Sequence, residues 1–193
     1  MSNPIAMLKK WLEEEIVAGA PNPQQAILST VSLNAVPHAR VVAIREVDEK
    51  GLLFFTQKQT KKVSELLQTP KVALTFWFEL LQREVIIEGS ADFLTEFENN
   101  VYWQTYPREA QIRFCSYAPT SSKPIKSKDV LEGLKKELEQ QYESKTLPLS
   151  KDYCGVRIQP AKMIFYAYRV DELSDVMEYT STQTGWMKQC LSP

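Results

Sequence analysis

Strand-like segments dominate the first half of the chain, and a single short helical segment interrupts them. The sequence predicts five strands, at residues 26–32, 38–45, 52–56, 72–78 and 83–93. The run from Val72 to Phe78 is especially rich in aromatic and apolar residues typical of strands. The helix, residues 61–67, follows the third strand. Because helices and strands do not alternate regularly, the pattern argues against a doubly wound parallel sheet and favours an antiparallel barrel with added helices.

The other predicted elements flank this barrel region, residues 26–93. We expect an N-terminal helix at 4–18, helical segments at 96–114 and 129–142, and C-terminal strands within 153–191. Asn3 is a suitable N-cap for the first helix, whose apolar face would carry Ile5, Leu8, Leu12 and Ile16. Two strands, 153–159 and 162–168, should pair across Pro160-Ala161. With no repeat or linker, residues 1–193 are predicted to form one mainly β domain with helices (α+β).

Composition excludes several classes of function. The 193 residues carry a net charge of −1, so no global field favours nucleic acid or a membrane surface. The start lacks a signal-peptide pattern and no segment is apolar enough to span a membrane, so we expect a cytoplasmic protein. Its three cysteines are then expected to be reduced thiols. His38 is the only histidine, and it is expected on a strand surface. A zinc site or a Ser-His-Asp triad therefore has little to be built from, and chemistry should come from a cofactor.

Four cations cluster between residues 40 and 62. Arg40 and Arg45 end an apolar run, Val-Val-Ala-Ile, which suits a strand buried on both faces. Thr60 could cap a helix that begins Lys61-Lys62, where backbone N–H groups and the helix dipole favour an anion. Guanidinium groups suit a phosphate. The alternative is that these cations simply face water.

Over nearly the whole chain, these segments resemble the pyridoxine/pyridoxamine 5′-phosphate oxidase family. The matching stretches are Asn3–Leu12, Arg40–Arg45, Asp48–Thr56, Tyr102–Ile112, Thr120–Ser122 and Gly185–Pro193. The resemblance implies an antiparallel, Greek-key-like split β-barrel, forming a homodimer with FMN at the interface.

It also implies a set of cofactor residues. Arg40 and Lys62 match residues at the FMN phosphate, and Lys61 stands where an arginine is usual. The positions matching the lining of the flavin ring are Val41, Val42, Ile44, Arg45, Phe55 and Thr56, and Thr120 and Ser121 match a polar pair that reaches the cofactor from a loop.

The resemblance fails where the family holds the phosphate of its vitamin B6 substrate. Arg45 and Tyr102 are plausible substrate ligands, but the family's arginine and serine are replaced by Tyr106 and Ala110. In the C-terminal motif, a tryptophan, an arginine, a histidine and a second arginine are replaced by Tyr166, Glu172, Ser174 and Val176. Glu172 reverses a charge that faces an anionic substrate. An alignment shifted by three residues would use Arg169 instead, but would break the match at Tyr179 and Trp186.

Glu84 replaces a glutamine near the flavin, where a carboxylate would disfavour the anionic reduced ring unless it were protonated or paired, for example with Arg83. We therefore predict an FMN-dependent oxidase that passes a hydride from a small substrate to FMN, with reoxidation by O2 and an altered substrate. One alternative is a true pyridoxamine 5′-phosphate oxidase with a phosphate site rebuilt from Arg45, Tyr102 and Tyr106. Another is a non-enzymatic flavin-binding module.

Overall fold

A computed structural model describes residues 3–193, which divide into two compact units. Of the described residues, the barrel unit comprises 3–54, 65–92 and 157–193, and the helical unit comprises 55–64 and 93–156. Each unit buries its own aromatic and aliphatic side chains. The expectation of a single domain stays a prediction.

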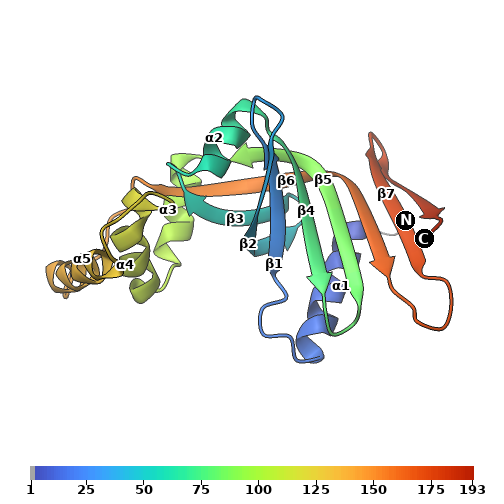
Figure 1. Ribbon diagram of the computed structural model, residues 1–193, viewed down its shortest axis with the longest axis horizontal. Coiled ribbons are helices and arrows are strands. Elements are labelled where there is room, and N and C mark those ends of the chain that lie inside the picture. Colours follow the sequence, from blue (N-terminus) through green and yellow to red (C-terminus); the bar gives the residue numbers. More distant parts are fainter. Residues whose placement is uncertain (1–2) are drawn as a thin grey trace. The chain divides into compact units, whose positions relative to one another are not determined.

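A closed antiparallel barrel is built from six strands of an eight-stranded sheet. The strands are β1 (Gln25–Val31), β2 (Pro37–Asp48), β3 (Gly51–Gln57), β4 (Lys71–Phe78), β5 (Arg83–Phe93), β6 (Tyr153–Ala167), β7 (Asp175–Thr182) and β8 (Gly185–Leu191). Their order is β3-β2-β1-β4-β5-β6-β7-β8, and a β3–β6 pairing closes the ring (Figure 1). The predicted α+β class and split β-barrel are confirmed.

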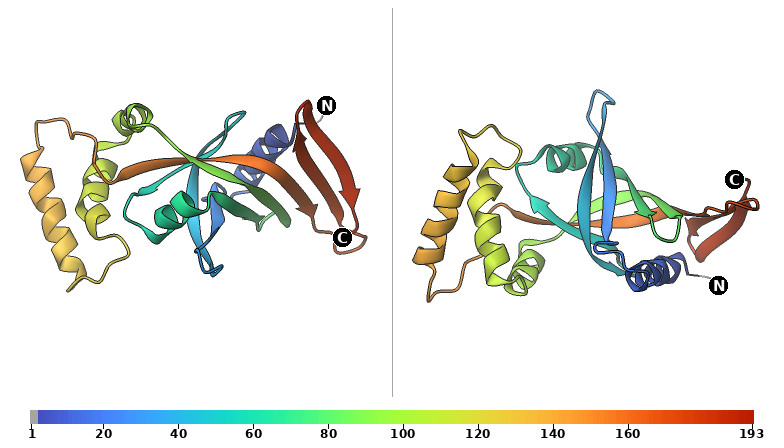
Figure 2. Two further views of the ribbon diagram at one scale, coloured as in Figure 1. Left: turned by 90° about the horizontal axis from the view of Figure 1, so that it is seen from above. Right: turned by 60° about the horizontal axis from the view of Figure 1, so that its bottom comes forward.

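Five α-helices lie within residues 3–193, near the predicted positions. They are α1 (Pro4–Val17), α2 (Lys61–Gln68), α3 (Glu96–Gln104), α4 (Arg108–Tyr117) and α5 (Lys128–Gln141), and a 3-10 turn, Ala118–Thr120, follows α4. Both views of Figure 2 show α4 and α5 side by side. Within residues 3–193, no helix has the length and apolar character needed to cross a membrane.

Helix α1 begins at its predicted cap, but its buried face differs from the expectation near its C-terminal end. The Asn3 side chain accepts a hydrogen bond from the Ile5 N–H, and Ile5 and Leu8 are buried. Ile16, expected on the same face, is exposed, and Glu15 is buried instead. The Glu15 carboxylate accepts the backbone N–H groups of Leu80 and Leu81 in the β4–β5 turn. These two hydrogen bonds offset the free-energy cost of burying the carboxylate. Hydropathy alone predicts that a glutamate at this position is exposed.

Strand β2 is buried on one face only, so the expectation of burial on both faces is wrong. Val42 and Ile44 point into the barrel, whereas Val41 is 61% exposed and Ala43 is exposed. Apolar residues at consecutive positions predicted two covered faces, but the outer face of a barrel has no second layer in the single chain.

Strand β6 runs unbroken through Pro160, so the predicted hairpin at Pro160-Ala161 is wrong. Proline normally marks the end of a strand or an irregular position. Here it lies where β6 passes Gly89 of β5: a Cβ at Gly89 would lie 2.2 Å from the Gln159 carbonyl oxygen and 3.2 Å from the Pro160 Cα. From Lys162 onward β6 pairs with β7. The proline therefore marks a close crossing of strands within the barrel unit.

Replacing Gly89 by alanine should lower the free energy of unfolding by about 3 kcal/mol, since the added methyl group meets backbone atoms that must move. Gly133 in α5 is the matched control, because a Cβ there meets nothing within 4 Å. Alanine at Gly133 should raise stability by about 0.5–1 kcal/mol through helix propensity. Urea unfolding of both variants measures the difference, and an unchanged midpoint for the Gly89 variant would contradict the crossing.

The helical unit has its own aromatic core. Its buried members are Trp103, Ile112, Phe114, Ala118, Leu147 and Tyr153. Thr95 starts α3 with a capping box, in which its hydroxyl accepts the Glu98 N–H and the Glu98 carboxylate accepts the Thr95 N–H. Helix α5 is polar outside, and its Lys135–Glu139 ion pair spans 3.5 Å on the exposed face. The core thus rests mainly on α3, α4 and the start of β6.

Candidate functional site

Arg40 is held inside the barrel unit by neutral and acidic partners. Its Nη1 donates to Thr30 Oγ1 at 2.6 Å and to the Leu28 carbonyl oxygen at 3.2 Å. Its Nη2 lies 3.6 Å from Glu65 Oε2. Burial lowers the pKa of the Arg40 guanidinium, and the Glu65 carboxylate opposes that change. An arginine starts so far above neutrality that the group stays charged, so it remains a fixed cation.

The other predicted β2 residues divide between the two faces of the strand. Val42 and Ile44 point inward, and Val41 and Arg45 point outward. Arg45 is the extra residue of a β-bulge, because the register with β3 shifts between Ile44 and Glu46. It lines a groove of about 230 Å³ on the barrel unit, with the α1 residues Lys9, Leu12, Glu13 and Ile16 among the other lining residues. A bulge that re-aims one cation is a feature common beside active sites.

In the helical unit, the end of β3 is joined to α2 and to the loop after α4. Lys62 Nζ donates to Thr56 Oγ1 at 2.9 Å. Gln57 Nε2 donates to the Tyr117 hydroxyl at 3.3 Å, and Ser121 Oγ donates to Gln57 Oε1 at 3.3 Å. The Thr120 hydroxyl donates to the Tyr117 carbonyl oxygen at 3.3 Å. The structure therefore brings Thr56 near Lys62, and Ser121 near the same strand through Gln57.

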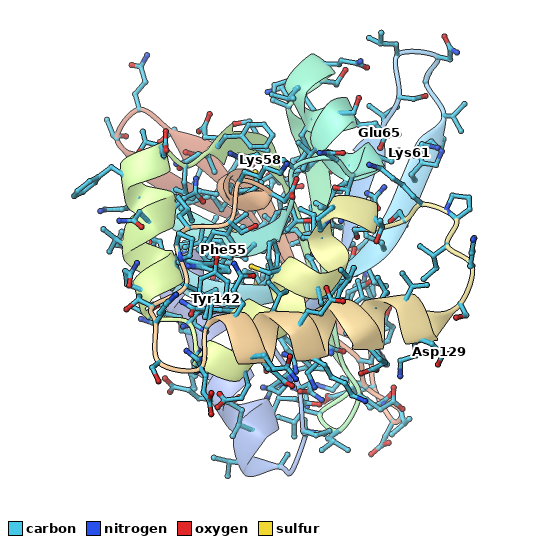
Figure 3. The ribbon with its side chains drawn as sticks, turned by 90° about the vertical axis from the view of Figure 1, so that its left-hand side faces the viewer. Phe55, Lys58, Lys61, Glu65, Asp129 and Tyr142 are labelled. Atoms are coloured by element: carbon cyan, nitrogen blue, oxygen red, sulfur yellow. The ribbon has the colours of Figure 1, made fainter. Side chains whose placement is uncertain are left out.

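The start of α2 has the expected cations but an unexpected hydroxyl contact. Lys61 is exposed, and Figure 3 labels it together with Phe55 and Lys58 of the same unit. The Thr60 carbonyl oxygen accepts the Ser64 N–H, which opens the helix. The Thr60 hydroxyl, expected to cap the helix, donates to the Gln57 carbonyl oxygen at 2.8 Å. It thus holds the turn between β3 and α2.

Phe55, Tyr102 and Tyr106 belong to the aromatic packing of the helical unit. The Phe55 ring stacks on Tyr153 with centroids 4.8 Å apart, and it lies 5.2 Å from Tyr102. Tyr106 lies 6.3 Å from Trp103 in a near-parallel arrangement. Tyr106, at the family's arginine position, therefore adds to an aromatic cluster.

Glu84 lies beside an aromatic cluster of the barrel unit, and its expected pairing with Arg83 is wrong. Arg83 pairs with Glu14 instead, because consecutive strand residues point to opposite faces. The Tyr168 hydroxyl lies 3.5 Å from Glu84 Oε2, and the Tyr168 ring lies 4.2 Å from Tyr166. Burial first, and then the Glu84 carboxylate, raise the pKa of Tyr168. Tyr166 and Glu84 are thus brought together, with Tyr168 between them.

The substituted C-terminal motif surrounds Arg169. Arg169 Nη2 lies 3.0 Å from Asp175 Oδ2, and its Nε lies 3.8 Å from Glu172 Oε1. The Arg169 backbone N–H donates to Ser174 Oγ at 3.2 Å. Val176 is buried and opposes Tyr166 across the β6–β7 pairing. The one arginine of this loop is therefore already neutralised by neighbouring carboxylates.

Sequence reasoning missed several residues of these networks, among them Thr30, Glu65, Gln57 and Tyr168. It also placed His38 on a strand surface, whereas His38 is half-buried with its Nδ1 2.8 Å from Glu65 Oε1. Glu65 looks like an ordinary polar position of a short helix, and no local signal marks its burial. Tyr168 follows Tyr166 by two residues, and this spacing places both on one strand face. That spacing was the one available signal.

Cys154 should react slowly with thiol reagents. Burial raises its pKa to about 11, against the opposing charges of Lys58 and Lys62. The unfolded thiol loses its proton near its ordinary pKa, so this contribution to stability is complete below about pH 8.5 and is lost as pH rises towards 11. Exposed Cys190 should react first in a timed thiol titration. Equal rates for the two cysteines would contradict the burial of Cys154.

Comparison with known proteins gives a consistent family. A family model described as pyridoxamine 5′-phosphate oxidase matches residues 12–142. A pyridoxine/pyridoxamine 5′-phosphate oxidase from Alteromonas mediterranea is 34% identical over 100% of this chain and 90% of its own. Another, from Trichormus variabilis, is 32% identical over 100% of this chain and 89% of its own.

Two solved structures match the fold closely. PhzG from Burkholderia lata, in complex with tetrahydrophenazine-1-carboxylic acid, superposes with a TM-score of 0.88 at 25% identity, covering 100% of this chain and 94% of its own. A pyridoxamine 5′-phosphate oxidase-related, FMN-binding protein from Nostoc punctiforme has a TM-score of 0.79 at 17% identity, covering 97% and 96% of the two chains. The second likeness concerns the fold alone.

Proposed function

The chain belongs to the pyridoxamine 5′-phosphate oxidase family, and on that premise we propose that it is an FMN-dependent oxidoreductase whose substrate is not a vitamin B6 phosphate. FMN is the cofactor of this family. When bound, FMN supplies the redox chemistry, taking a hydride from the substrate and passing electrons to O2, which becomes hydrogen peroxide. The chain's own residues have to bind the cofactor and orient the substrate.

The donor chemistry of the described residues fits FMN. We assign the phosphate to Arg40, Lys61 and Lys62, because charge-assisted hydrogen bonds are the strong contacts of a phosphate. Lys62 also donates to the Thr56 hydroxyl, which directs its ammonium group to the end of β3. The residues that we assign to the flavin ring are Val41, Val42, Ile44, Arg45, Phe55, Thr56, Thr120 and Ser121. Val42 and Ile44 point into the barrel, so their part would be to fix the position of strand β2. The Glu84–Tyr168 contact would keep the Glu84 carboxylate hydrogen-bonded beside the ring.

The observation that carries the change of substrate is the loop around Arg169. Glu172 and Ser174 stand where the family has an arginine and a histidine for its substrate, and both contact Arg169. Asp175 adds a second carboxylate to the same guanidinium. A phosphate dianion brought to this loop would meet two carboxylates around one arginine, which is unfavourable. A substrate without a phosphate avoids that repulsion.

We further propose a planar, partly reduced ring compound as the substrate. PhzG, which was solved with tetrahydrophenazine-1-carboxylic acid, supports this class because it shares the fold along the whole chain. Tyr102 and Tyr106 would offer aromatic faces to a ring, and Arg45 would offer one cation to a carboxylate. Loss of the family's phosphate donors costs such a substrate nothing, since it carries no phosphate.

A homodimer with FMN at the interface, working in the cytoplasm, completes the proposal. Ile27 of β1 and Val41 of β2 are opposite each other in the sheet, and both are exposed on the outer face of the barrel unit. Exposed apolar side chains that adjoin one another favour association. Val41→Glu should therefore convert a dimer to a monomer in sedimentation velocity, with Leu33→Glu, an exposed loop position, as control. A wild-type monomer would contradict this part.

Anaerobic reduction of the bound flavin tests the activity. The FMN-loaded protein is mixed without oxygen with pyridoxine 5′-phosphate, or with tetrahydrophenazine-1-carboxylic acid as a phosphate-free ring compound. We expect bleaching of flavin absorbance by the ring compound and none by saturating pyridoxine 5′-phosphate. Bleaching by the B6 phosphate would favour the second candidate, a true oxidase of that substrate, which the names of the curated relatives support. A protein that binds no FMN would remove both.

Restoring the family's residues provides a second test. The double variant Glu172→Arg, Ser174→His should make pyridoxine 5′-phosphate bleach the flavin at least about tenfold faster than the detection limit of the assay, because each regained charge-assisted hydrogen bond is worth about 1.5–3 kcal/mol. Asp171→Arg is the control, since it adds the same charge to the loop at a neighbouring position. Equal gains in the two variants would mean that net charge, and not the family's geometry, is responsible.

A further inference from the structure

We propose that Glu65 is a positioning residue for Arg40, which it holds through Thr30 in the orientation that receives the cofactor phosphate. This inference rests on the proposed role of Arg40 at the phosphate of FMN. Glu65 itself does not touch the cofactor in this arrangement. Its effect passes through the hydroxyl of Thr30 and the guanidinium of Arg40.

The Glu65 carboxylate is buried in the barrel unit, where Oε2 is hydrogen-bonded and Oε1 lies beside an imidazole. Its side chain is 4% exposed, on the α2 residue labelled in Figure 3. Oε2 accepts the Thr30 hydroxyl at 2.6 Å and lies 3.6 Å from Arg40 Nη2. Oε1 lies 2.8 Å from His38 Nδ1. A buried carboxylate is tolerated when hydrogen bonds and cations compensate for its burial, and the Thr30 hydroxyl and the Arg40 guanidinium do so at Oε2.

Thr30 links the carboxylate to the guanidinium. Its hydroxyl donates to Glu65 Oε2 and accepts from Arg40 Nη1, both at 2.6 Å. The Leu28 carbonyl oxygen takes a second bond from the same Nη1. An arginine side chain loses rotamer entropy when it is fixed. Because the network fixes Arg40 before any anion binds, the free energy of binding would not be reduced by the entropic cost of ordering this side chain.

A positioning role and a purely electrostatic role for Glu65 predict opposite changes in the affinity for FMN. The negative charge by itself repels a phosphate, so a purely electrostatic role predicts tighter binding whenever the charge is removed. A positioning role predicts that only variants that break the hydrogen bonds weaken binding. Glutamine can keep them: its oxygen can accept from Thr30, and its NH2 group can donate to His38 Nδ1 in the other imidazole tautomer. Leucine has a similar size and keeps neither bond.

The experiment compares FMN with riboflavin, which lacks the phosphate. The full-length apoprotein is titrated with each flavin, and quenching of flavin fluorescence gives the two dissociation constants. Their ratio, riboflavin over FMN, isolates phosphate recognition. We expect Glu65→Gln to keep or raise the wild-type ratio. Glu65→Leu and Thr30→Val should each lower the ratio about tenfold, a loss equivalent to that of one net hydrogen bond. Riboflavin binding should change by less than about twofold in all three, since the ring contacts are untouched.

Three results would overturn the inference. The ratio could stay at the wild-type value in both Glu65→Leu and Thr30→Val, it could fall as far in Glu65→Gln as in Glu65→Leu, or riboflavin affinity could fall in step with FMN affinity. Thr30→Val keeps the experiment decisive if the leucine variant fails to fold. Lys62→Met separates this inference from the proposed function. If the wild-type ratio is near one and Lys62→Met leaves it unchanged, both the inference and the proposed phosphate site are wrong. A high wild-type ratio that falls in Lys62→Met but in no Glu65 or Thr30 variant would sink this inference alone.

Discussion

Replacing Trp103 by alanine should lower the free energy of unfolding by about 4 kcal/mol. Trp103 has no exposed surface, and its ring contacts Phe114 and Tyr153 with centroids 5.8 and 5.0 Å away. Its Nε1 also donates to the Leu147 carbonyl oxygen at 3.2 Å, and that acceptor would be left buried without this donor. Deletion of a large buried ring leaves a cavity that the neighbouring aromatics can fill only in part.

Phe97→Ala is the matched control for Trp103→Ala, because Phe97 lies on the same helix α3 and is 77% exposed. Its unfolding free energy should stay within about 0.5 kcal/mol of the wild type. Chemical unfolding monitored by far-UV circular dichroism measures both variants without relying on tryptophan emission. Similar losses in the two variants would show that Trp103 is not the centre of the helical unit's core.

Arg40→Met should weaken FMN binding about 100-fold and leave riboflavin binding nearly unchanged. Methionine keeps much of the aliphatic stem and removes the guanidinium, so what is lost is charge-assisted donation to the phosphate, about 3 kcal/mol. Fluorescence titration of the apoprotein with each flavin measures the effect. The result depends on the phosphate, because the ring is the same in both ligands.

Arg40→Lys is the informative companion to Arg40→Met. Lysine keeps the charge and loses the forked geometry, and its ammonium cannot bond Thr30 and the Leu28 carbonyl oxygen in the way the guanidinium does. We expect an intermediate loss of FMN affinity. A thermal melt of each variant detects a folding defect, which is the greater concern for Arg40→Met because Glu65 then loses a cation 3.6 Å away. If methionine lowered FMN and riboflavin affinity equally, Arg40 would not be a phosphate ligand.

Arg40 and its hydrogen-bond partners differ in how far the sequence alone could identify them. Arg40 stood out in the sequence because it ends an apolar strand and matches a family position, so its candidacy needed no structure. Its partners did not stand out, because Glu65 follows it by 25 positions along the chain and Thr30 precedes it by 10. Side chains that meet across strands and helices are chosen by packing, which leaves no local pattern.

Other errors have the same origin. A proline predicted a hairpin at Pro160, but a glycine on a neighbouring strand lets β6 pass straight through. Glu84 was expected to pair with Arg83, yet Arg83 turns to Glu14 on α1 and Glu84 to Tyr168. In each case the deciding partner is distant in sequence, so periodicity and turn chemistry could not reveal it.

By itself the sequence determined the order and type of most elements, the barrel class and the family, because hydrophobic period, capping residues and turn residues act over a few positions. The unbroken β6 is the exception. The sequence also predicted that the family's B6-phosphate ligands are replaced at Tyr106, Glu172 and Ser174. Only the tertiary structure decided that Arg40 is tied to a buried carboxylate and that Arg169 is enclosed by Glu172 and Asp175. The reason is physical: the free energy of a charged group depends on burial and on neighbours within a few ångströms, and folding alone sets both.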